Sequence, residues 1–523
     1  MTDAAADAPV SAGIVAGRAA IAEPATTFHS RDVATGEDRA AAFADASTSE
    51  AESAAAAAES AFLLAQLGER RLDPGALIRS VIAALEEHRD HLVEVAGAET
   101  GLSPERLHSE LSRTTGQFAL LAAAAAGASG VAVEEDQGDP TAPSLALGRV
   151  PLGPVAVFGA SNFPFAFGVL GGDTAAALAA GCPVVVKGHP AHPETSQVLA
   201  EIVTEVLADL QWPLGWFSLL HGRGSAIGRA LVVAEGIAAV AFTGSTRGGL
   251  ALVEAAASRP VPIPVFAELG GINALYLLPE AAQDAAACDG DGLSSTFVSG
   301  LSQSVTGGSG QFCTKPGLLV LVDDPAGRAV IAGLSAALDA VRTPPLLTPG
   351  ILHALVSGAE RLRVQNPVDV LLAGPDERAV PEAPVPAFLA TVTSDALRAD
   401  PSIADELFGP ALVVVRCSSV EDLLDLTATV PGGLTATIHA SDTEPETALA
   451  LLRRLRLRAG RVLFGGFPTG VRVGRATTHG GPYPATSAPG TTSVGLHAMD
   501  RFLRPVTFQD LPGGFREPAL SWR

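Results

Sequence analysis

The stretch PVVVKGHPAHPETSQVLAEIVTEVLADL (residues 183–210) has the pattern of a short strand followed by a helix. Its valine run stops at Lys187 and Gly188, which predicts a buried strand of the parallel-sheet type. Pro193 suits the first position of a helix, and Glu194 suits its positive end. The apolar residues that share one face of this helix are Val198, Ile202, Val206 and Leu210. The stretch therefore predicts one strand–helix unit.

The same alternation continues on both sides of this unit. Short apolar runs that end in glycine or polar residues recur at VAVFGA (155–160), WFSLLHG (216–222), AAVAFTG (238–244) and PVFAELGG (264–271). Strands that alternate with helices at this spacing predict the α/β class, with a doubly wound parallel sheet covered by helices on both faces. Ligands of such sheets bind beyond the carboxyl ends of the strands. The polar residues expected at that edge are Asn162, Lys187, Ser245 and Glu268.

The length of 523 residues predicts about three to four domain-sized units. A loose lead-in with short strands is expected to about residue 45, and helical periodicity follows to about residue 127. A polar break covers 134–144, before the strand–helix region. A second mixed α/β block runs from about 272 to 480, and the segment after it is rich in Pro, Thr and Arg.

Composition excludes several classes of protein. Hydrophobic residues make up 47% of the chain, which is typical of a globular fold. The formal net charge is −22 and we find no basic patch, so a nucleic-acid partner is not expected. The apolar stretches 118–133 and 153–172 are too short or too rich in Pro and Asn to span a membrane. Four scattered cysteines and a first segment without a basic n-region predict reduced thiols in the cytoplasm and no metal site.

Chemistry is concentrated in GGSGQFCTKPG (307–317), where Cys313 follows a glycine-rich approach. Taken alone, Cys313 is more simply interpreted as a small buried core residue than as a nucleophile, although glycines let backbone amides approach a reacting atom. Glu268 ends an apolar strand, and a solvated carboxylate is the simpler interpretation there. HGRGSAIG (221–228) misses the dinucleotide-binding spacing by one residue, which favours a plain turn into a helix.

Six motifs together resemble one family, in the right order along the chain. They are GASNFP (159–164), VVVK (184–187), FTGS (242–245), ELGG (268–271), GQFC (310–313) and ELFGP (406–410). The chain resembles the aldehyde dehydrogenases from about residue 40 onward. Longer stretches, such as GPVAVFGASNFPFAF (153–167), resemble the branch of 2,5-dioxovalerate (α-ketoglutarate semialdehyde) dehydrogenases and NADP-dependent fatty aldehyde dehydrogenases. GGFPTG (465–470) departs from this branch, because Gly465 replaces the usual asparagine in a loop near the substrate.

The resemblance implies a mechanism and a set of cofactor contacts. Cys313 is expected to attack the aldehyde carbon, while Asn162 and the Cys313 N–H stabilise the oxyanion and Glu268 activates water. The implied cofactor contacts are Lys187 at the adenosine ribose; Gly244, Ser245 and Gly249 at the pyrophosphate; and Leu269, Glu406 and Phe408 toward the nicotinamide.

Cofactor choice is predicted from the residues after Lys187. NAD-selective aldehyde dehydrogenases commonly have a glutamate three residues after this lysine, and its carboxylate repels the extra phosphate of NADP. Here Pro190 occupies that position, and His189 or Arg223 would add positive charge. We therefore predict that NADP is preferred and that NAD is still used.

The resemblance also implies a domain organisation and an assembly. The expected parts are the N-terminal helical part of the cofactor domain (1–133), a bridging or oligomerisation arm (134–153), a Rossmann-like cofactor-binding domain (154–271), the catalytic thiol domain (272–480) and a C-terminal oligomerisation tail (481–523). We expect a homodimer or a homotetramer.

The expected substrate is 2,5-dioxopentanoate, with Arg472 as a candidate partner of its carboxylate; aliphatic (fatty) aldehydes are the alternative. Two other classes stay open. One is a cysteine hydrolase or acyltransferase that pairs Cys313 with His479, and the other is a non-catalytic protein that keeps the fold.

Overall fold

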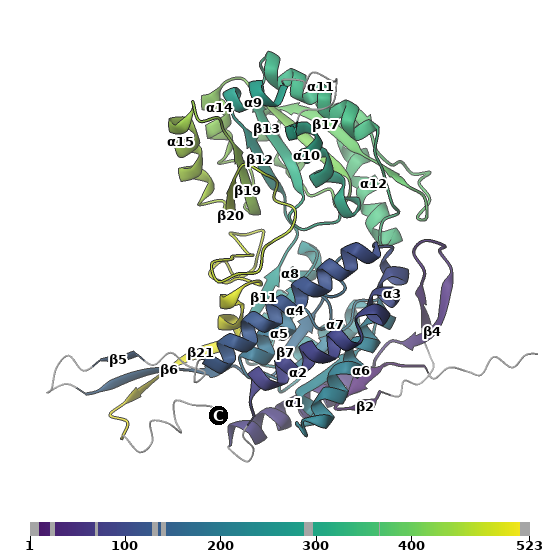
Figure 1. Ribbon diagram of the computed structural model, residues 1–523, viewed down its shortest axis with the longest axis vertical. Coiled ribbons are helices and arrows are strands. Elements are labelled where there is room, and N and C mark those ends of the chain that lie inside the picture. The colour runs from purple at the N-terminus through teal and green to yellow at the C-terminus, as the bar shows by residue number, and fades with distance from the viewer. Residues whose placement is uncertain are drawn as a thin grey trace, which may run out of the picture.

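The computed structural model describes residues 10–20, 27–67, 72–127, 134–136, 143–286, 296–365 and 367–512. The chain forms two lobes and one projecting arm (Figure 1). Each lobe contains a seven-stranded sheet with helices on both faces. The predicted α/β architecture is confirmed.

The sheet of the first lobe has the strand order β11-β10-β7-β8-β9-β1-β2. Its parallel strands are β7 (Val155–Phe158), β8 (Val184–Lys187), β9 (Phe217–Leu220), β10 (Ala239–Thr243) and β11 (Val265–Glu268). β1 (Gly13–Val15) and β2 (Arg18–Ala19) extend one edge as antiparallel strands. The strand order reverses at β7, since β8 and β9 lie on one side of it and β10 and β11 on the other. Such a switch point is where doubly wound sheets bind ligands.

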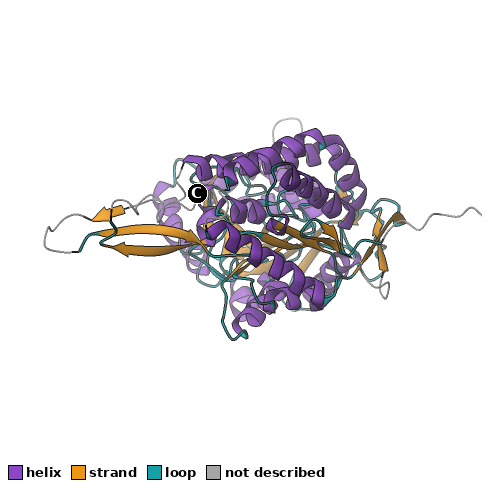
Figure 2. Ribbon diagram, turned by 90° about the horizontal axis from the view of Figure 1, so that it is seen from below, coloured by secondary structure: helices purple, strands orange, loops and turns teal. Residues whose placement is uncertain are grey.

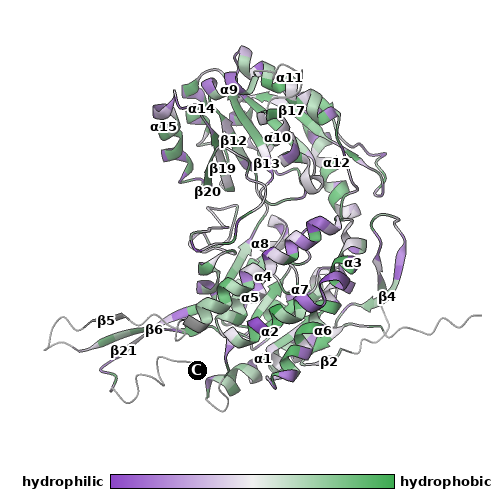
Figure 3. Cartoon of the chain, viewed as in Figure 1, coloured by the Kyte–Doolittle hydropathy of each residue, from purple (hydrophilic) through white to green (hydrophobic). Residues whose placement is uncertain are grey.

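Helices cover both faces of this sheet, which explains the nearly continuous apolar runs of its strands. Val155 and Val157 of β7 belong to one hydrophobic cluster, and Ala156 and Phe158 belong to another on the opposite face. The first face carries α2 (Pro74–Glu87), α3 (Arg89–Thr100), α4 (Pro104–Gly127), α5 (Gly172–Ala179) and α6 (Pro193–Asp209). The second carries α1 (Thr48–Gln66), α7 (Ser225–Val233) and α8 (Thr246–Ala257). Hydrophobic colour follows the central strands in Figure 3.

The helix predicted at Pro193 begins there because a buried carboxylate binds its first amides. Glu99 at the end of α3 accepts hydrogen bonds from the Glu194 and Thr195 N–H groups, each at 2.8 Å, and from the Thr195 hydroxyl at 2.6 Å. A negative charge at a helix N-terminus is favourable, because the unpaired amides there carry partial positive charge. A short hairpin, β3 (Thr27–Arg31) with β4 (Asp38–Ala44), lies beside this end of the lobe.

The second lobe has the strand order β15-β17-β18-β13-β12-β19-β20. These strands are β12 (Asn273–Leu277), β13 (Pro316–Val322), β15 (Asp369–Ala373), β17 (Phe388–Thr393), β18 (Ala411–Cys417), β19 (Gly433–His439) and β20 (Ala459–Phe464), and β15 alone among them is antiparallel to its neighbour. One face packs against α9 (Pro279–Ala286), α10 (Thr296–Thr306) and α11 (Pro325–Asp339). The other packs against α12 (Pro349–Val364), α13 (Ser394–Ala399), α14 (Val420–Leu426) and α15 (Pro445–Leu455). A small ladder of β14 (Arg342–Thr343) and β16 (Val385–Pro386) completes the lobe.

The arm is a three-stranded antiparallel sheet that projects from the first lobe (Figures 1 and 2). β6 (Leu145–Pro151) is its middle strand, with β5 (Glu134–Asp136) on one side and β21 (Leu503–Gln509) on the other. The strands β5 and β6 and the C-terminal strand β21 therefore belong to one sheet.

Before it reaches the arm, the C-terminal segment crosses the junction of the lobes and runs along β11. The Leu269 N–H donates to the Ala485 carbonyl at 2.9 Å, and the Ser487 N–H donates to the Ala267 carbonyl at 3.0 Å. Among the described residues, no helix is long and apolar enough to cross a membrane.

Candidate active site

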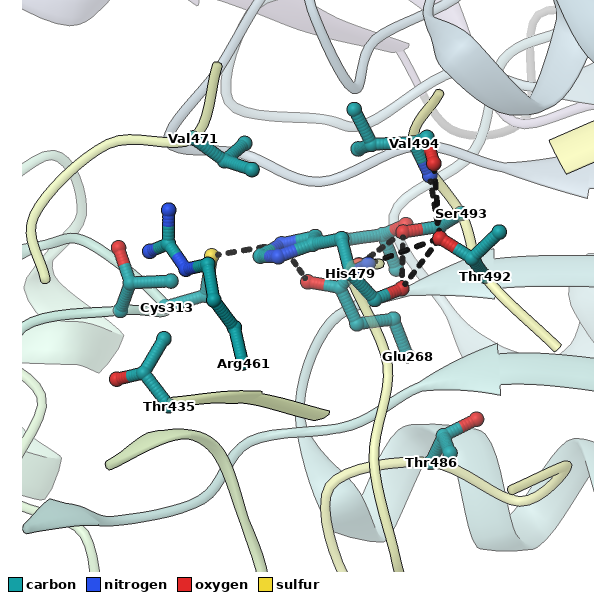
Figure 4. Close-up of polar contacts among 12 residues, drawn as sticks. Glu268, Cys313, Thr435, Arg461, Val471, His479, Thr486, Thr492, Ser493 and Val494 are labelled. Atoms are coloured by element: carbon teal, nitrogen blue, oxygen red, sulfur yellow. Dashed lines mark hydrogen bonds and ion pairs between the residues drawn. The ribbon is translucent and has the colours of Figure 1, made fainter. Parts of the chain in front are cut away.

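Cys313, His479 and Glu268 meet where the two lobes and the C-terminal segment come together (Figure 4). Glu268 is the last residue of β11, and Cys313 lies between the short 3-10 helix Gly307–Gly310 and β13. The Cys313 Sγ is 3.5 Å from His479 Nε2, which is 3.0 Å from Glu268 Oε1. The side chains of His479 and Glu268 are 1% and 4% exposed, whereas Cys313 is half-buried, so the cluster reaches the surface at this cysteine.

The C-terminal segment fixes two members of this cluster. The Ser493 hydroxyl donates to Glu268 Oε2 at 2.5 Å. The His479 N–H donates to the Thr492 hydroxyl, and the His479 carbonyl accepts from the Ser493 N–H, each at 2.8 Å. The sequence named His479 only as a partner of Cys313 in a hydrolase. Its contact with Glu268 depends on a fold-back that no local pattern indicates.

Burial and neighbouring charges have opposing effects on the pKa values of Cys313 and Glu268. Burial raises the pKa of the Cys313 thiol well above its usual range; the carboxylates of Glu268 and Glu406 raise it further, and Arg113 lowers it. Burial alone would raise the pKa of Glu268, but His479 and the hydrogen bonds to this carboxylate outweigh it and hold that pKa below its usual range. The cluster therefore holds a protonated thiol beside an ionised carboxylate, and attack by sulfur requires a proton transfer to a neighbour.

Two asparagines hold the loop that carries Cys313. The Asn162 side-chain amide donates to the Gln311 carbonyl at 2.7 Å. The Asn273 amide donates to the Cys313 carbonyl at 2.8 Å and to the Lys315 carbonyl at 3.1 Å. The backbone on both sides of the thiol is thus fixed by side chains from β12 and from the loop after β7.

The ELFGP segment packs against the same loop through glycine. Gly310 has a φ of +68°, and a Cβ there would lie 2.2 Å from the Gly409 carbonyl carbon. Glu406 lies against Gly270, where a Cβ would approach its Oε2 to 2.4 Å. Burial raises the pKa of Glu406 to about 7, against the opposing effects of Lys315 and the Gly271 N–H. Phe408, two residues further on, is half-buried.

A cavity of about 500 Å³ lies over the carboxyl ends of β7, β8 and β9. Its lining brings together all four residues on which the cofactor prediction rests: Lys187, His189, Pro190 and Arg223. HGRGSAIG forms the expected turn into α7, and its Gly224 and Gly228 also line the cavity. The sequence missed Arg229 of α7, which lines the cavity as well.

The predicted pyrophosphate residues lie at the start of α8, next to this cavity. Ser245 caps the helix, because its hydroxyl accepts from the Gly248 N–H at 3.2 Å, and Gly248 lines the cavity. The Gly244 N–H donates to the Glu268 carbonyl at 3.1 Å. A Cβ on Gly249 would lie 2.2 Å from Leu269 Cδ2, so these two predicted cofactor residues pack directly against each other.

The charge of the cavity differs from the expectation at His189. Burial and the nearby His192 and Lys187 lower the pKa of His189 well below its usual value, so its ring is neutral and adds no positive charge. Burial lowers the pKa of Lys187 to about 8, against the opposing effect of Asp45. Arg223 pairs with Asp45 at 3.0 Å and lies over the Phe28 ring. The cationic side chains of the lining are Lys187, Arg223 and Arg229.

On the substrate side, two arginines differ in their burial. The predicted Arg472 is exposed, whereas Arg113 of α4 is partly buried near the cluster. Arg113 Nε donates to the Val471 carbonyl at 3.3 Å, and the guanidinium lies over the Phe167 ring, 5.2 Å from its centre. The centre of the Phe167 ring is 5.9 Å from that of His479. Arg113 Nη2 is buried and has no hydrogen-bond partner among the described residues.

The loop with Gly465 is fastened close to Cys313. Arg461 donates to the Pro468 carbonyl at 2.7 Å and to the Gly470 carbonyl at 2.9 Å, and the Gly470 N–H donates to the Thr314 hydroxyl. Gly465 itself has a φ of +65° with open space around a Cβ. Asparagine tolerates this conformation, so the departure from the branch leaves the shape of the loop compatible with either residue.

The first sheet has a cavity at its carboxyl edge, and the same edge carries the Glu268 carboxylate beside the Cys313 thiol at the junction with the second lobe. These features are those of a dinucleotide-dependent enzyme with a candidate thiol nucleophile. The chain belongs to the aldehyde dehydrogenase family, whose sequence profile matches residues 21–504. It is an oxidoreductase that acts on aldehydes with a nicotinamide dinucleotide, and these predictions are confirmed.

Similar proteins support this assignment. The alpha-ketoglutaric semialdehyde dehydrogenase 2 of Azospirillum brasilense is 43% identical over 437 residues, which are 83% of this chain and 81% of that protein. The alpha-ketoglutaric semialdehyde dehydrogenase of Acinetobacter baylyi is 37% identical over 478 residues, 90% of this chain and 88% of that protein. The crystal structure of lactaldehyde dehydrogenase from Escherichia coli matches with a TM-score of 0.81 at 20% identity, covering 96% of this chain and 99% of that one. This last likeness shows the fold.

Proposed function

We propose that this enzyme oxidises 2,5-dioxopentanoate to 2-oxoglutarate, with NADP preferred over NAD, in the cytoplasm. The observation that carries the chemical part is the Cys313–His479–Glu268 cluster, whose Glu268 lies at the same carboxyl edge of the sheet as the cofactor cavity. The names of the two relatives from Azospirillum and Acinetobacter support the substrate. The free thiols of Cys182 and Cys417, both buried, fit a reducing compartment.

In the first step, the Cys313 thiol loses its proton to the adjacent His479–Glu268 pair, and the thiolate adds to the aldehyde carbon. Asn162 carries two amide hydrogens, one of which the Gln311 carbonyl binds. The second is available to the new oxyanion together with the Cys313 N–H. Loss of one such donor typically costs about 3–4 kcal/mol of transition-state stabilisation.

The fit of the cofactor rests on the cavity and its charges. Its volume, its lysine and arginines, and the adjoining N-terminus of α8 suit a phosphorylated nucleotide. When bound, the nicotinamide cofactor supplies the hydride acceptor. Lys187, Arg223 and Arg229 would hold the adenosine end, and Glu406 and Phe408 would orient the nicotinamide end.

In the last step, Glu268 accepts a proton from the water that hydrolyses the Cys313 thioester. Its ionised state suits a base; the Ser493 hydroxyl donates to one carboxylate oxygen, and His479 Nε2 lies 3.0 Å from the other. His479 is therefore a positioning residue for Glu268 as well as a proton acceptor for Cys313.

The far carboxylate of 2,5-dioxopentanoate requires a cation, and we assign this contact to Arg113 in place of Arg472. The buried Nη2 of Arg113 has no partner among the described residues, and its ring neighbour Phe167 also contacts His479. Hydrogen bonds to charged groups contribute about 1.5–3 kcal/mol, so this contact would favour ω-oxo acids over neutral aldehydes by about ten-fold or more.

One kinetic experiment tests the proposal. Reduction of NADP and of NAD is followed spectrophotometrically with 2,5-dioxopentanoate, a short neutral aldehyde and a long aliphatic aldehyde. We expect the highest kcat/KM with 2,5-dioxopentanoate and NADP. A far higher kcat/KM for the long aldehyde would overturn the substrate, and a preference for NAD of about ten-fold, or about 1.4 kcal/mol, would overturn the cofactor.

A further inference from the structure

The Cys313–His479–Glu268 cluster has a second chemical property, because its donor atoms form a set of metal ligands. One thiol, one imidazole nitrogen and one carboxylate oxygen lie within 4.8 Å of one another. They come from β11, from the loop before β13 and from the loop after β20 (Figure 4). Three protein ligands with one further position open is the arrangement of zinc sites that exchange their fourth ligand.

Two of the three separations between the donor atoms, sulfur to nitrogen and nitrogen to oxygen, are close to those of tetrahedral zinc, and the third is no longer than 4.8 Å. Tetrahedral zinc with Zn–S of about 2.3 Å and Zn–N of about 2.0–2.1 Å places sulfur and nitrogen about 3.5 Å apart. Cys313 Sγ and His479 Nε2 are 3.5 Å apart. Zinc would separate the imidazole nitrogen and the carboxylate oxygen by about 3.4 Å, compared with 3.0 Å between His479 Nε2 and Glu268 Oε1. A shift of a few tenths of an ångström at Glu268 would therefore bring the distance between His479 Nε2 and Glu268 Oε1 to the value that zinc requires.

The ligands are also held in place before any ion arrives. The Ser493 hydroxyl binds the second oxygen of Glu268, and the Thr492 hydroxyl binds the backbone of His479. Outer hydrogen bonds of this kind orient ligands in zinc sites and strengthen the binding.

We propose that Zn²⁺ binds reversibly to Cys313 Sγ, His479 Nε2 and the Glu268 carboxylate and holds the enzyme in an inactive state. Binding exchanges the thiol proton, which leaves to solvent, for a Zn–S bond, and no oxidation or reduction takes place. The ion would occupy the lone pair that attacks the aldehyde and the carboxylate that activates water. Zinc and a covalently bound substrate therefore exclude each other. The inhibition rests on the proposed function, whereas the binding does not.

Metal binding is measured directly on the full-length protein. Equilibrium dialysis with Zn²⁺, followed by metal analysis, is expected to give one zinc per chain. Cobalt(II) in its place is expected to give thiolate-to-cobalt charge-transfer absorption and the intense visible bands of a tetrahedral site. Loss of outer hydrogen bonds alone weakens metal binding by about 10–100-fold, so Cys313→Ala and His479→Gln should each weaken it by at least about 100-fold.

Two controls make this test decisive. His497→Gln removes an exposed histidine that also pairs with a carboxylate, Asp500, at 2.9 Å, and it should leave zinc binding unchanged. Alkylation of Cys313 in the wild-type protein, verified by peptide mass, should abolish zinc binding without any mutation. This control keeps the test valid if the Cys313→Ala variant fails to fold.

The site would be overturned if zinc still bound after alkylation or to a folded Cys313→Ala variant. It would also be overturned if the wild-type chain bound no zinc at millimolar concentration. We expect the rate of aldehyde oxidation to fall in proportion to the fraction of chains that carry zinc, and to recover when a chelator removes the metal. Stoichiometric zinc on an enzyme that oxidises no aldehyde would leave the metal site standing and overturn the proposed function instead.

Discussion

At the scale of single residues, the sequence identified side chains that lie inside contiguous motifs. Cys313, Glu268 and Asn162 each stand in a short segment that resembles the family, and the structure brings Glu268 and Cys313 to one cluster and Asn162 to the Cys313 loop. His479 is 166 residues from Cys313 in the chain, and its position depends on the return of the C-terminal segment along β11. Arg113 and Arg229 could not be predicted for the same reason, since burial and a missing partner are properties of the folded chain.

Glu268→Gln should block the hydrolysis of the thioester more than its formation. Glutamine keeps the shape of the side chain but cannot accept a proton from water, and the pKa of Glu268 lies below its usual range, so the wild-type residue is ionised. General-base catalysis contributes about 10²–10⁴-fold, and steady-state turnover should fall by that factor. Intact mass after mixing with aldehyde and cofactor should show the acyl adduct on Cys313. The exposed Glu52→Gln is the control, and normal turnover in Glu268→Gln would refute the role.

The affinity for NADP should fall as the pH rises through about 8. The pKa of Lys187 is lowered to about 8 by burial, so its ammonium is present below that pH and is lost above it. A phosphate favours the charged form, and KM for NADP should increase by up to about ten-fold per pH unit above the pKa. Asp45 opposes the effect of burial on this lysine, and the charged Lys187 lowers the pKa of His189, His192 and His221. NAD lacks the phosphate, so the ratio of the two KM values between pH 7 and 9.5 isolates the effect; a constant ratio would contradict it.

Arg113→Gln should distinguish a substrate contact from a structural arginine. The variant should raise KM for 2,5-dioxopentanoate by about 10–100-fold, the equivalent of 1.5–3 kcal/mol for a hydrogen bond to a charged group. KM for a neutral aldehyde of similar length should change little. Arg472→Gln, at an exposed arginine, is the matched control and should change neither. Equal losses with both aldehydes would mean that Arg113 only supports the fold.

At the scale of elements, apolar runs and helix-start residues predicted the sheet of the first lobe and α6. The apolar positions of residues 76–96 fit one continuous helical face, but the structure breaks this segment at His88 into α2 and α3. His88 Nδ1 lies 2.9 Å from the Ala84 carbonyl, and Arg89 bonds back to Glu86 and across to the His108 carbonyl on α4. A bend of this kind is fixed by contacts with another helix, and periodicity along one segment does not record them.

The turn before Cys313 gives a prediction about one glycine. Gly310 has a φ of +68° and packs on the Gly409 carbonyl, so alanine there is both strained and without space. Backbone strain of this kind costs about 1–3 kcal/mol, and displacement of the loop by about 1 Å can reduce turnover by about 100-fold. Gly307→Ala, three residues earlier with nothing within 4 Å of a Cβ, should keep both stability and activity. Thermal unfolding and kcat measure the two effects, and a fully active Gly310→Ala would contradict the argument.

At the scale of the whole molecule, the sequence predicted two α/β blocks but not how they are joined. The chain enters the second lobe directly after Glu268, and residues 485–495 return to cover that carboxylate. β21 then pairs with β6, more than 350 residues earlier in the chain. The segment after residue 480 thus contributes first to the candidate active site and then to the arm. Pairings over such distances depend on shape and burial across the whole chain, which no local pattern carries.

The arm gives the last prediction, which concerns assembly. Leu145 and Leu147 of β6 lie on the same face of the arm, because side chains two residues apart in a strand point the same way, and they are 41% and 37% exposed. We expect a second copy of the chain to cover them in a homodimer or homotetramer. Burial of a leucine contributes about 1.5–3 kcal/mol, so Leu145→Glu with Leu147→Glu should weaken association by at least about 100-fold. Light scattering at micromolar protein should then report a monomer. Leu449 of α15, in the other lobe, is similarly exposed, and Leu449→Glu should leave the oligomer intact. A wild-type monomer, or an oligomer that survives the double substitution, would show that the arm does not join the subunits.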